Sequence, residues 1–482
     1  EATAGRTDLD LLVERGAVSR AVGVLADAGF REAVSRWGED PPGIRHYYGM
    51  DPETRRLVHV HLFSRVLTGE SFVKSHLLPL ETMLLENTQR VGPLRVAAKP
   101  AELVLFTLRL YIKYGSPLDL LIVGRQGAGL REEVHWLRDG EDLSRSLALL
   151  REHCPVVEEG LFVRCVEALE RGSLLRRVQL AWQVRRRLSV YAQRTFPQRL
   201  LAYLRMLWAE AQRRLAGKPG GKVLAAGGAV IAVVGADATG KSTIVAETAR
   251  WLGGPFAVRT VHAGKPPATW LTAPLNLLLP LMRRRASSLR TNRLEGHLAA
   301  DGDERASAGD ERASAEDERA PDRDRGLAAL VYAVRAVAVA WDRRSLLVRA
   351  RRRAARGEMI ISDRYPSDTI GVMDSPRLRE RPGSRGLAGA LGNWLARLEA
   401  RLYREIPPPD IVLRLHVSVE TAQRRNRERV KPGKESDAYV ESRHRQTRAW
   451  HRAGARRIYD IDAEQSLADT LRDVQQRIWD AL

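Results

Sequence analysis

The sequence predicts an α/β protein whose C-terminal part is a parallel sheet flanked by helices, preceded by a helical region and an N-terminal α/β domain. Strand-like and helix-like patterns alternate from residue 229 to the end, which is typical of a parallel sheet covered by helices. Helical periodicity dominates between about 121 and 217. The glycine-rich stretch 217–221 separates these two regions. We therefore expect domains at 1–120, 121–225 and 226–482.

The N-terminal domain carries two acidic residues at the start of a predicted strand. Side chains alternate along a strand, so Asp8 and Asp10 share a face and could hold Mg²⁺. A later predicted strand, residues 57–62, places His59 and His61 on one face, where they could also bind a metal. An exposed histidine pair without a metal is the alternative interpretation.

The middle region is rich in arginine and in apolar residues at helical spacing. Residues 174–204 predict a helical stretch. Trp182 and Tyr191 lie among its arginines, and we interpret them as core residues rather than as contacts to nucleic acid.

A phosphate-binding loop follows the first strand of the C-terminal domain. The apolar run 229–234 predicts a strand buried on both faces, and the next residues match the pattern G-x-x-x-x-G-K-[ST]. In such a loop backbone amides surround phosphate oxygens, the lysine reaches the β- and γ-phosphates, and the hydroxyl binds Mg²⁺. The expected nucleotide-binding residues are Gly235, Ala236, Asp237, Ala238, Thr239, Gly240, Lys241, Ser242 and Thr243.

A second strand, expected after Gly357, ends in Asp363 and Arg364. The carboxyl ends of parallel strands meet at the ligand edge of a sheet, so both residues are expected beside the loop. Asp363 would bind Mg²⁺ and Arg364 would grip a phosphate. An ordinary Asp–Arg pair in a loop is the alternative.

A basic helix follows the strand predicted at 411–417. Its arginines, among them Arg425 and Arg429, suit a lid that closes over the transferring phosphate. A solvated basic helix face is the alternative. The last predicted strand, 457–461, precedes a helix that begins with a capping box at Ser466.

An acidic low-complexity insertion is expected at about 300–325. Residues 301–320 form a near-repeat of Asp-Glu-Arg-Ala-Ser-Ala with few side chains large enough to bury. We interpret it as a spacer. A tail that competes with anionic ligands is the alternative.

From about residue 229 onward these motifs resemble the thymidylate kinase family of P-loop nucleoside monophosphate kinases. The resemblance rests on the loop with Asp237 inside it, the strand ending Asp363-Arg364-Tyr365, the basic lid and the last strand and helix. It implies a five-stranded parallel sheet, ATP and Mg²⁺ as cofactors, and phosphoryl transfer to a nucleoside monophosphate, with dTMP as the best guess. Lys241 and Ser242 would hold the donor phosphates, Asp363 and Arg364 would serve magnesium and phosphate, and Arg425 and Arg429 would form the lid.

One segment departs from this family. Members specific for thymidine nucleotides carry an Arg-Glu-Pro-Gly-like segment after the second strand, whereas residues 261–267 here read Val-His-Ala-Gly-Lys-Pro-Pro. The acceptor could therefore be a phosphorylated sugar, lipid or cell-surface precursor. Lys265 could still meet an acceptor phosphate.

The N-terminal domain resembles the nucleotidyltransferase fold in the Asp8-x-Asp10 strand and the helix after it. The Gly-Ser turn usual upstream is absent, and we expect that the domain is cut short at its start. Histidines occupy the strand where a third acidic residue is usual. A nucleotidyltransferase fold with an altered site is the favoured interpretation, and a working nucleotidyltransferase site is the alternative.

Composition adds expectations about partners and location. The formal net charge of +20 would attract polyanions, which keeps open a P-loop ATPase coupled to polyanion binding, although nothing indicates nucleic acid specifically. The two cysteines fit no metal or disulfide framework, and no signal peptide or membrane span is visible, so we expect a cytoplasmic protein. A homodimer is a further option.

Overall fold

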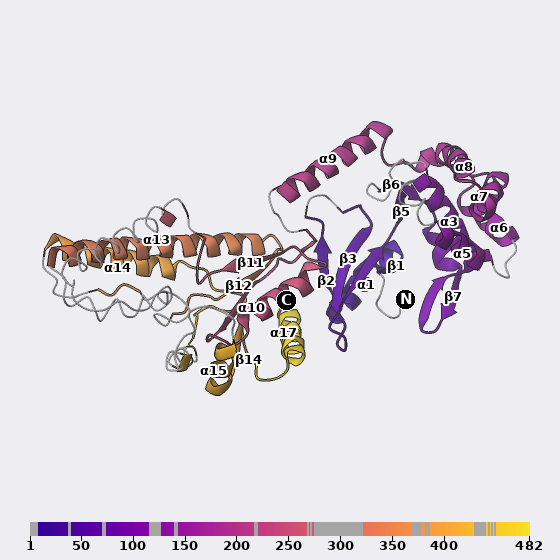
Figure 1. Ribbon diagram of the computed structural model, residues 1–482. Coiled ribbons are helices and arrows are strands. Elements are labelled where there is room, and N and C mark those ends of the chain that lie inside the picture. Colours follow the sequence, from indigo (N-terminus) through magenta and orange to yellow (C-terminus); the bar gives the residue numbers. More distant parts are fainter. Residues whose placement is uncertain are drawn as a thin grey trace, which may run out of the picture. The chain divides into compact units, whose positions relative to one another are not determined.

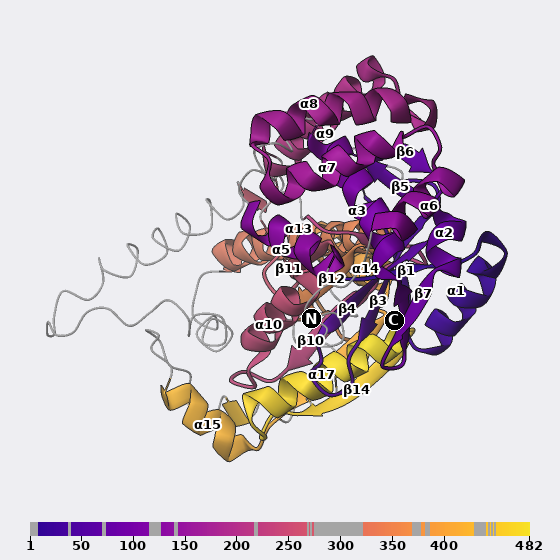
Figure 2. The same ribbon diagram turned by 90° about the vertical axis from the view of Figure 1, so that its right-hand side faces the viewer.

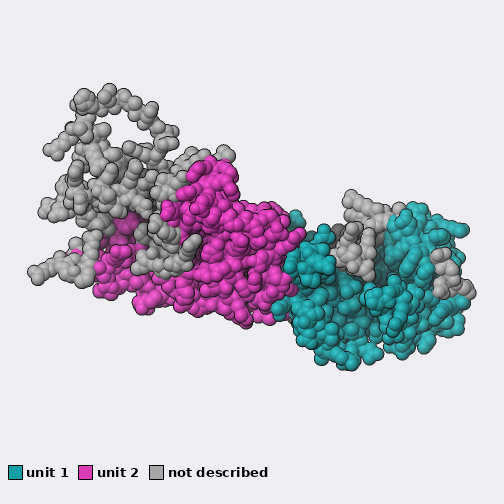
Figure 3. Space-filling model, turned by 90° about the horizontal axis from the view of Figure 1, so that it is seen from below, with its two compact units in different colours: residues 1–218 teal, residues 219–482 magenta. Residues whose placement is uncertain are grey.

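The computed structural model divides the chain into two compact units, Glu1–Lys218 and Pro219–Leu482 (Figure 3). The boundary lies within the glycine-rich stretch 217–221. The structure describes residues 8–36, 40–69, 74–114, 127–138, 143–215, 220–267, 269, 272–273, 322–368, 377–380, 386–428, 440–441, 444, 447 and 450–482.

A small mixed sheet opens unit 1. Its strands lie in the order β1-β4-β3-β2; β1 is parallel to β4, and the other neighbours are antiparallel. Helix α1 contributes apolar side chains to the core on one face of this sheet, which is built on Tyr47, Val60 and Leu62. The elements are β1 (Leu9–Leu12), α1 (Val18–Asp27), β2 (Arg31–Val34), β3 (Ile44–Met50) and β4 (Leu57–Phe63). Because side chains alternate, residues 46, 59 and 61 lie on the face opposite this core.

Two antiparallel strand pairs and a group of helices complete unit 1 (Figure 1). The strand pairs are β5 (Val66–Gly69) with β6 (Lys74–Leu78), and β7 (Thr88–Val91) with β8 (Leu94–Ala97). Helix α3 packs against α5, α6 and α8 around an apolar core that includes Tyr111, Phe162 and Leu180. The helices are α2 (Glu81–Glu86), α3 (Lys99–Tyr114), α5 (Gly127–Arg138), α6 (Leu143–His153), α7 (Glu159–Arg171), α8 (Leu174–Arg187) and α9 (Phe196–Leu215).

The stretch predicted as helical at 174–204 is interrupted, and one of its aromatic residues is not in the core. Helix α8 ends at Arg187, a 3₁₀ turn covers Leu188–Tyr191, and α9 begins only at Phe196. Trp182 is 76% exposed, so its interpretation as a core residue was wrong. Arg177 is buried on α8 instead, because its Nε donates to the carbonyl of Ala168 at 2.8 Å and its Nη2 to that of Leu169 at 3.0 Å.

Unit 2 is built on a parallel sheet in the order β11-β12-β10-β13-β14, which confirms the parallel sheet predicted from the sequence. Its strands are β10 (Val230–Gly235), β11 (Val258–His262), β12 (Met359–Asp363), β13 (Ile411–His416) and β14 (Arg457–Asp462), and the two-residue strand β9 (Val223–Leu224) precedes them. Strand β10 is central and buried along its whole length, as its β-branched apolar sequence requires.

Helices cover both faces of this sheet. On one face α13 and α14 run side by side (Figure 1) and share a core with Val230, Ala232 and Val234 of β10. On the other face α10 and α17 lie next to each other (Figure 2) and contact the strands. The helices are α10 (Lys241–Gly253), α13 (Asp322–Ala354), α14 (Leu387–Arg404), α15 (Val419–Glu428) and α17 (Leu467–Ala481).

Within the described parts of the chain, no helix combines the length and the apolar character needed to cross a membrane. Residues 300–321 of the acidic insertion predicted at about 300–325 lie outside the described part of the chain.

Candidate functional site

The phosphate-binding loop, residues 236–240, connects the end of β10 to the start of α10. Gly240 precedes the helix with a φ of +88°, and Ala238 has a φ of +66°. At Gly235 a Cβ would lie 2.8 Å from Thr239 Oγ1 and 2.9 Å from the carbonyl oxygen of Leu415, so only glycine fits. The loop thus turns sharply onto the amino end of α10, where unpaired amide groups and the helix dipole favour an anion.

Lys241 lies in the first turn of α10 with its ammonium group over the loop. Its Nζ donates to the carbonyl of Ala236 at 2.5 Å and lies 3.8 Å from Asp237 Oδ1. The residue is only 7% exposed. Thr239 Oγ1 donates to the same carbonyl at 2.9 Å. The side chains of Thr239 and Lys241 therefore hold the loop in shape. The buried ammonium group of Lys241 lies beside the loop, where the motif predicts that the donor phosphates bind.

Asp363 stands at the end of β12, beside β10. The register pairs Val233 with Asp363, which brings the carboxylate to the edge of the sheet where the loop begins. Oδ1 of Asp363 is buried and has no hydrogen-bond partner among the residues that the structure describes. Its Oδ2 lies 3.6 Å from His262 Nε2. Since Mg²⁺ prefers carboxylate oxygens, Asp363 and the exposed hydroxyl residue Ser242 fit a magnesium site.

Arg364 joins the end of β12 to the loop. It adopts a φ of +66°, and its Nη2 lies 2.8 Å from Asp237 Oδ1. Asp237 therefore faces both Lys241 and Arg364. The sequence expectation that Asp237, Lys241, Asp363 and Arg364 meet at one edge of the sheet agrees with this arrangement.

A buried arginine on α13 supports the segment after β11. No sequence pattern distinguishes this arginine from the other arginines of the same helix. Arg343 is fully buried; its Nε donates to the carbonyl of Ala263 at 2.7 Å and its Nη2 to that of Gly264 at 3.0 Å. It also bonds the hydroxyl of Tyr403. A Cβ at Gly264 would lie 2.7 Å from Arg364 Cδ. This segment is thus packed directly against the phosphate site.

The predicted lid is described only in part. Arg425 lies on α15, and its Nη2 donates to the carbonyl of Ala463 at 3.0 Å, next to the end of β14. Arg429 lies outside the described residues. The lid role of both arginines stays a prediction.

A hollow of about 400 Å³ lies at the carboxyl ends of β13 and β14. Asp460 is among the residues that line it, accepts hydrogen bonds from Arg414 at 2.9 and 2.7 Å and contacts His416 at 2.5 Å. Burial alone would raise the pKa of Asp460, but the hydrogen bonds of Arg414 and His416 outweigh it and hold that pKa below its usual range. The hollow is therefore lined by a carboxylate that Arg414 holds in an ion pair, at the same sheet edge as the loop.

In unit 1 the predicted metal residues Asp8 and Asp10 lie beside the histidines of β4. Asp8 Oδ1 is 3.1 Å from His59 Nδ1, and Asp10 Oδ1 is 2.9 Å from His61 Nδ1. The hydrogen bond with His61 is the main cause of a lowered pKa at Asp10. A third histidine, His46 of β3, joins this group. Sequence reasoning missed it, because the pairing of β3 with β4 cannot be read from spacing.

No protein-family model matches the chain, and no curated protein matches it. Among solved structures, one similar chain is a deoxyadenosine kinase from M. mycoides with bound dATP. It is 16% identical with a TM-score of 0.26, and the match covers 52% of this chain and 98% of the kinase. This match is too distant to support an argument about function. The strand order and the loop themselves make unit 2 an α/β unit compatible with the P-loop kinase fold.

Proposed function

We propose that unit 2 is a kinase that uses ATP and Mg²⁺ to phosphorylate a nucleoside monophosphate, with dTMP as the first candidate acceptor. The observation that carries this proposal is the meeting of Lys241, Asp363 and Arg364 at one sheet edge, with a buried carboxylate oxygen of Asp363 that lacks a partner among the described residues. In a bound complex, the phosphates of ATP would contact Lys241 and Arg364, and its Mg²⁺ would contact the Asp363 oxygen that has no partner among the described residues.

The roles follow from charge and position. Loop amides and Lys241 would hold the β- and γ-phosphates, while Ser242 and Asp363 would hold Mg²⁺. Arg364 would exchange Asp237 for a phosphate oxygen, because a doubly charged phosphate attracts a guanidinium more strongly than one carboxylate does. An acceptor phosphate is already ionised near neutral pH, so alignment and charge neutralisation supply most of the catalysis, without a strong general base.

A kinase for a non-nucleotide phosphorylated acceptor is the second candidate. It is favoured by the segment 261–267, which lacks the Arg-Glu-Pro-Gly-like pattern and instead places His262 near Asp363 and Gly264 against Arg364. A phosphorylated sugar or lipid would use the same loop and metal, and only the acceptor contacts would differ.

The test measures ADP release by the full chain with Mg²⁺ and ATP, against a panel of nucleoside monophosphates and sugar phosphates. We expect strong stimulation by dTMP, and we expect Lys241→Ala and Asp363→Asn each to reduce the rate by about 10²–10³-fold. The matched control is Arg250→Ala, which removes an exposed cation from the last turn of the same helix as Lys241.

Three outcomes separate the candidates. Stimulation by a sugar or lipid phosphate alone, still dependent on Lys241, would replace the nucleotide acceptor with the second candidate. Hydrolysis of ATP without any acceptor, raised by a polyanion, would favour a coupled ATPase. Full activity of Lys241→Ala would refute the assignment of the site.

A further inference from the structure

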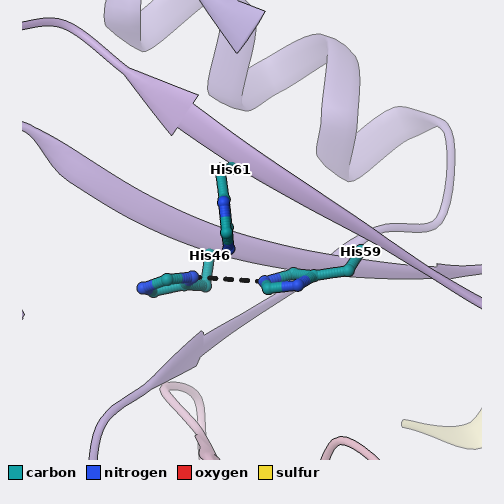
Figure 4. A group of neighbouring side chains, drawn as sticks. All are labelled: His46, His59 and His61. Atoms are coloured by element: carbon teal, nitrogen blue, oxygen red, sulfur yellow. Dashed lines mark hydrogen bonds between the residues drawn. The ribbon is translucent and has the colours of Figure 1, made fainter. Parts of the chain in front are cut away.

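Three histidines gather on the face of the unit 1 sheet that α1 does not cover. His59 and His61 occupy alternate positions of β4, and the register sets His46 of β3 opposite His61. One ring nitrogen from each residue lies within 4.8 Å of the other two. Figure 4 shows His61 directed toward the gap between the rings of His46 and His59. No step of the proposed kinase reaction uses this cluster.

Each imidazole has at least one carboxylate near a ring nitrogen. Asp8 faces Nδ1 of His59 at 3.1 Å, and Asp10 faces Nδ1 of His61 at 2.9 Å. Asp40 faces Nε2 of His46 at 3.7 Å and is itself oriented by the amide of Ser35, which donates to its Oδ2 at 2.9 Å. At His59 and His61 the carboxylate keeps the proton on the ring nitrogen that it faces, so the opposite nitrogen carries the lone pair, whereas Asp40, 3.7 Å from His46, acts on that ring by its charge alone.

Two ring nitrogens of the cluster face each other closely. Nδ1 of His46 lies 3.2 Å from Nε2 of His59. Without a metal this contact is a hydrogen bond in which Nδ1 of His46 donates to Nε2 of His59; once that proton is released, both nitrogens can turn a lone pair toward one cation. Two nitrogens bound to one tetrahedral zinc ion, at about 2.0–2.1 Å each, are about 3.3 Å apart. The spacing therefore suits a shared metal ion.

The third ring and the surroundings fit the same ion. The ring of His61 stands edge-on to His59 and His46, with centroids 4.1 and 4.7 Å away. Only 13%, 15% and 22% of the side chains of His46, His59 and His61 are exposed, so the group is sheltered. The carboxylates of Asp8 and Asp10 are 57% and 59% exposed, which leaves a path for the ion from solvent.

We propose that unit 1 binds a divalent first-row transition metal of the zinc type through Nδ1 of His46 and Nε2 of His59 and His61. Neutral imidazole suits zinc and its neighbours, whereas Mg²⁺ prefers oxygen. Asp8 and Asp10 then orient the ligating rings instead of forming the magnesium site expected from the sequence. The fourth position would hold water or an oxygen of Asp8, whose Oδ2 lies 3.9 Å from Nε2 of His61.

The test uses the full chain, stripped with a chelator and titrated with Co²⁺, which reports tetrahedral coordination through its visible absorption. Calorimetric titrations with Zn²⁺ and Mg²⁺ accompany it. We expect one equivalent of Co²⁺ or Zn²⁺ per chain and no comparable binding of Mg²⁺. We expect His46→Ala and His59→Ala each to weaken binding by at least about 100-fold, and Asp10→Asn to weaken it by about 10- to 100-fold.

The matched control is His135→Ala, which removes an exposed imidazole from helix α5 of the same unit. Circular dichroism verifies that each variant is folded, and Asp10→Asn tests the same site without removing a ring. Absence of a bound metal in the folded native chain would overturn the proposal and leave a shared proton between His46 and His59. Binding of Mg²⁺ that depends on Asp8 and Asp10 but not on the histidines would overturn it in favour of a carboxylate site.

Discussion

At the scale of single residues, Asp237 explains how the phosphate site can be charged and still ordered. Its carboxylate faces Lys241 at 3.8 Å and Arg364 at 2.8 Å, so the two cations are held near one anion instead of repelling each other. The cations are thereby positioned before a phosphate arrives, which lowers the entropy cost of ordering them on binding.

His76 makes the stability of unit 1 depend on pH. It is 3% exposed, and burial, aided by the charge of Arg199, lowers its pKa from 6.5 to about 4. At a pH between about 4 and 6.5, His76 is protonated in the unfolded chain but neutral in the folded chain. The stabilisation is therefore complete above about pH 6.5 and decreases as the pH falls toward 4, by about 3 kcal/mol for this residue.

The measurement is urea unfolding of the native chain and of His76→Gln at pH 7 and pH 5. We expect the variant to lose less stability between the two pH values, because glutamine does not titrate. Substitution of the exposed His135 by Gln serves as the control for the loss of an imidazole from the same unit. Equal pH dependence of native chain and His76→Gln would contradict the assignment.

Individual residues differed in how far the sequence could predict them. Lys241, Asp363 and Arg364 were predictable, because a loop of fixed spacing and the ends of parallel strands determine where such residues lie. The burial of Arg177 was not predictable, since the carbonyls of Ala168 and Leu169 that accept its hydrogen bonds belong to a separate helix. Helical spacing also did not show that Trp182 is exposed. His46 meets His61 only through the register of two antiparallel strands.

At the scale of elements, the N-terminal cap of the last helix should contribute measurably to the stability of unit 2. Ser466 precedes α17, and its Oγ accepts from the amide of Asp469 at 3.2 Å, as the capping box predicted. We expect Ser466→Ala to destabilise unit 2 by about 1 kcal/mol and Ser466→Thr to be nearly neutral, since threonine also caps and keeps the hydroxyl that donates to Asp469 Oδ2 at 2.6 Å. Thermal unfolding of unit 2 measures both, and equal loss in the two variants would point to a cause other than the cap.

Long or strongly patterned elements were also the predictable ones. Strand β10 follows directly from an apolar β-branched run, and helix α17 from the capping box at Ser466. The break between α8 and α9 was missed, because its residues continue the helical pattern of the sequence. Ala192 instead forms a β-bridge with His76, a contact distant in sequence that periodicity cannot reveal.

At the scale of the whole molecule, the two compact units should respond to ligands separately. We expect two unfolding transitions in calorimetry, of which Mg²⁺ with ATP stabilises only that of unit 2, by about 2.7 kcal/mol at a hundredfold excess over Kd. Ser466→Ala identifies that transition by lowering it, and Lys241→Ala should abolish the ATP effect. A single transition, or stabilisation of both units by ATP, would contradict the expectation.

The position of β10 at the centre of its sheet has a consequence for protein synthesis. Its neighbours come much later in the chain: the amide of Val230 bonds Asp410, 180 residues further on. A ribosome that adds about 5–20 residues per second needs roughly 10–40 s to make that stretch. For most of that time, until β12 is made, the most apolar strand of unit 2 has both edges open to other chains, and the edge that pairs with β13 stays open to the end. We therefore expect a chaperone that binds nascent chains to raise the yield of folded protein, because it would cover this strand until β13 emerges.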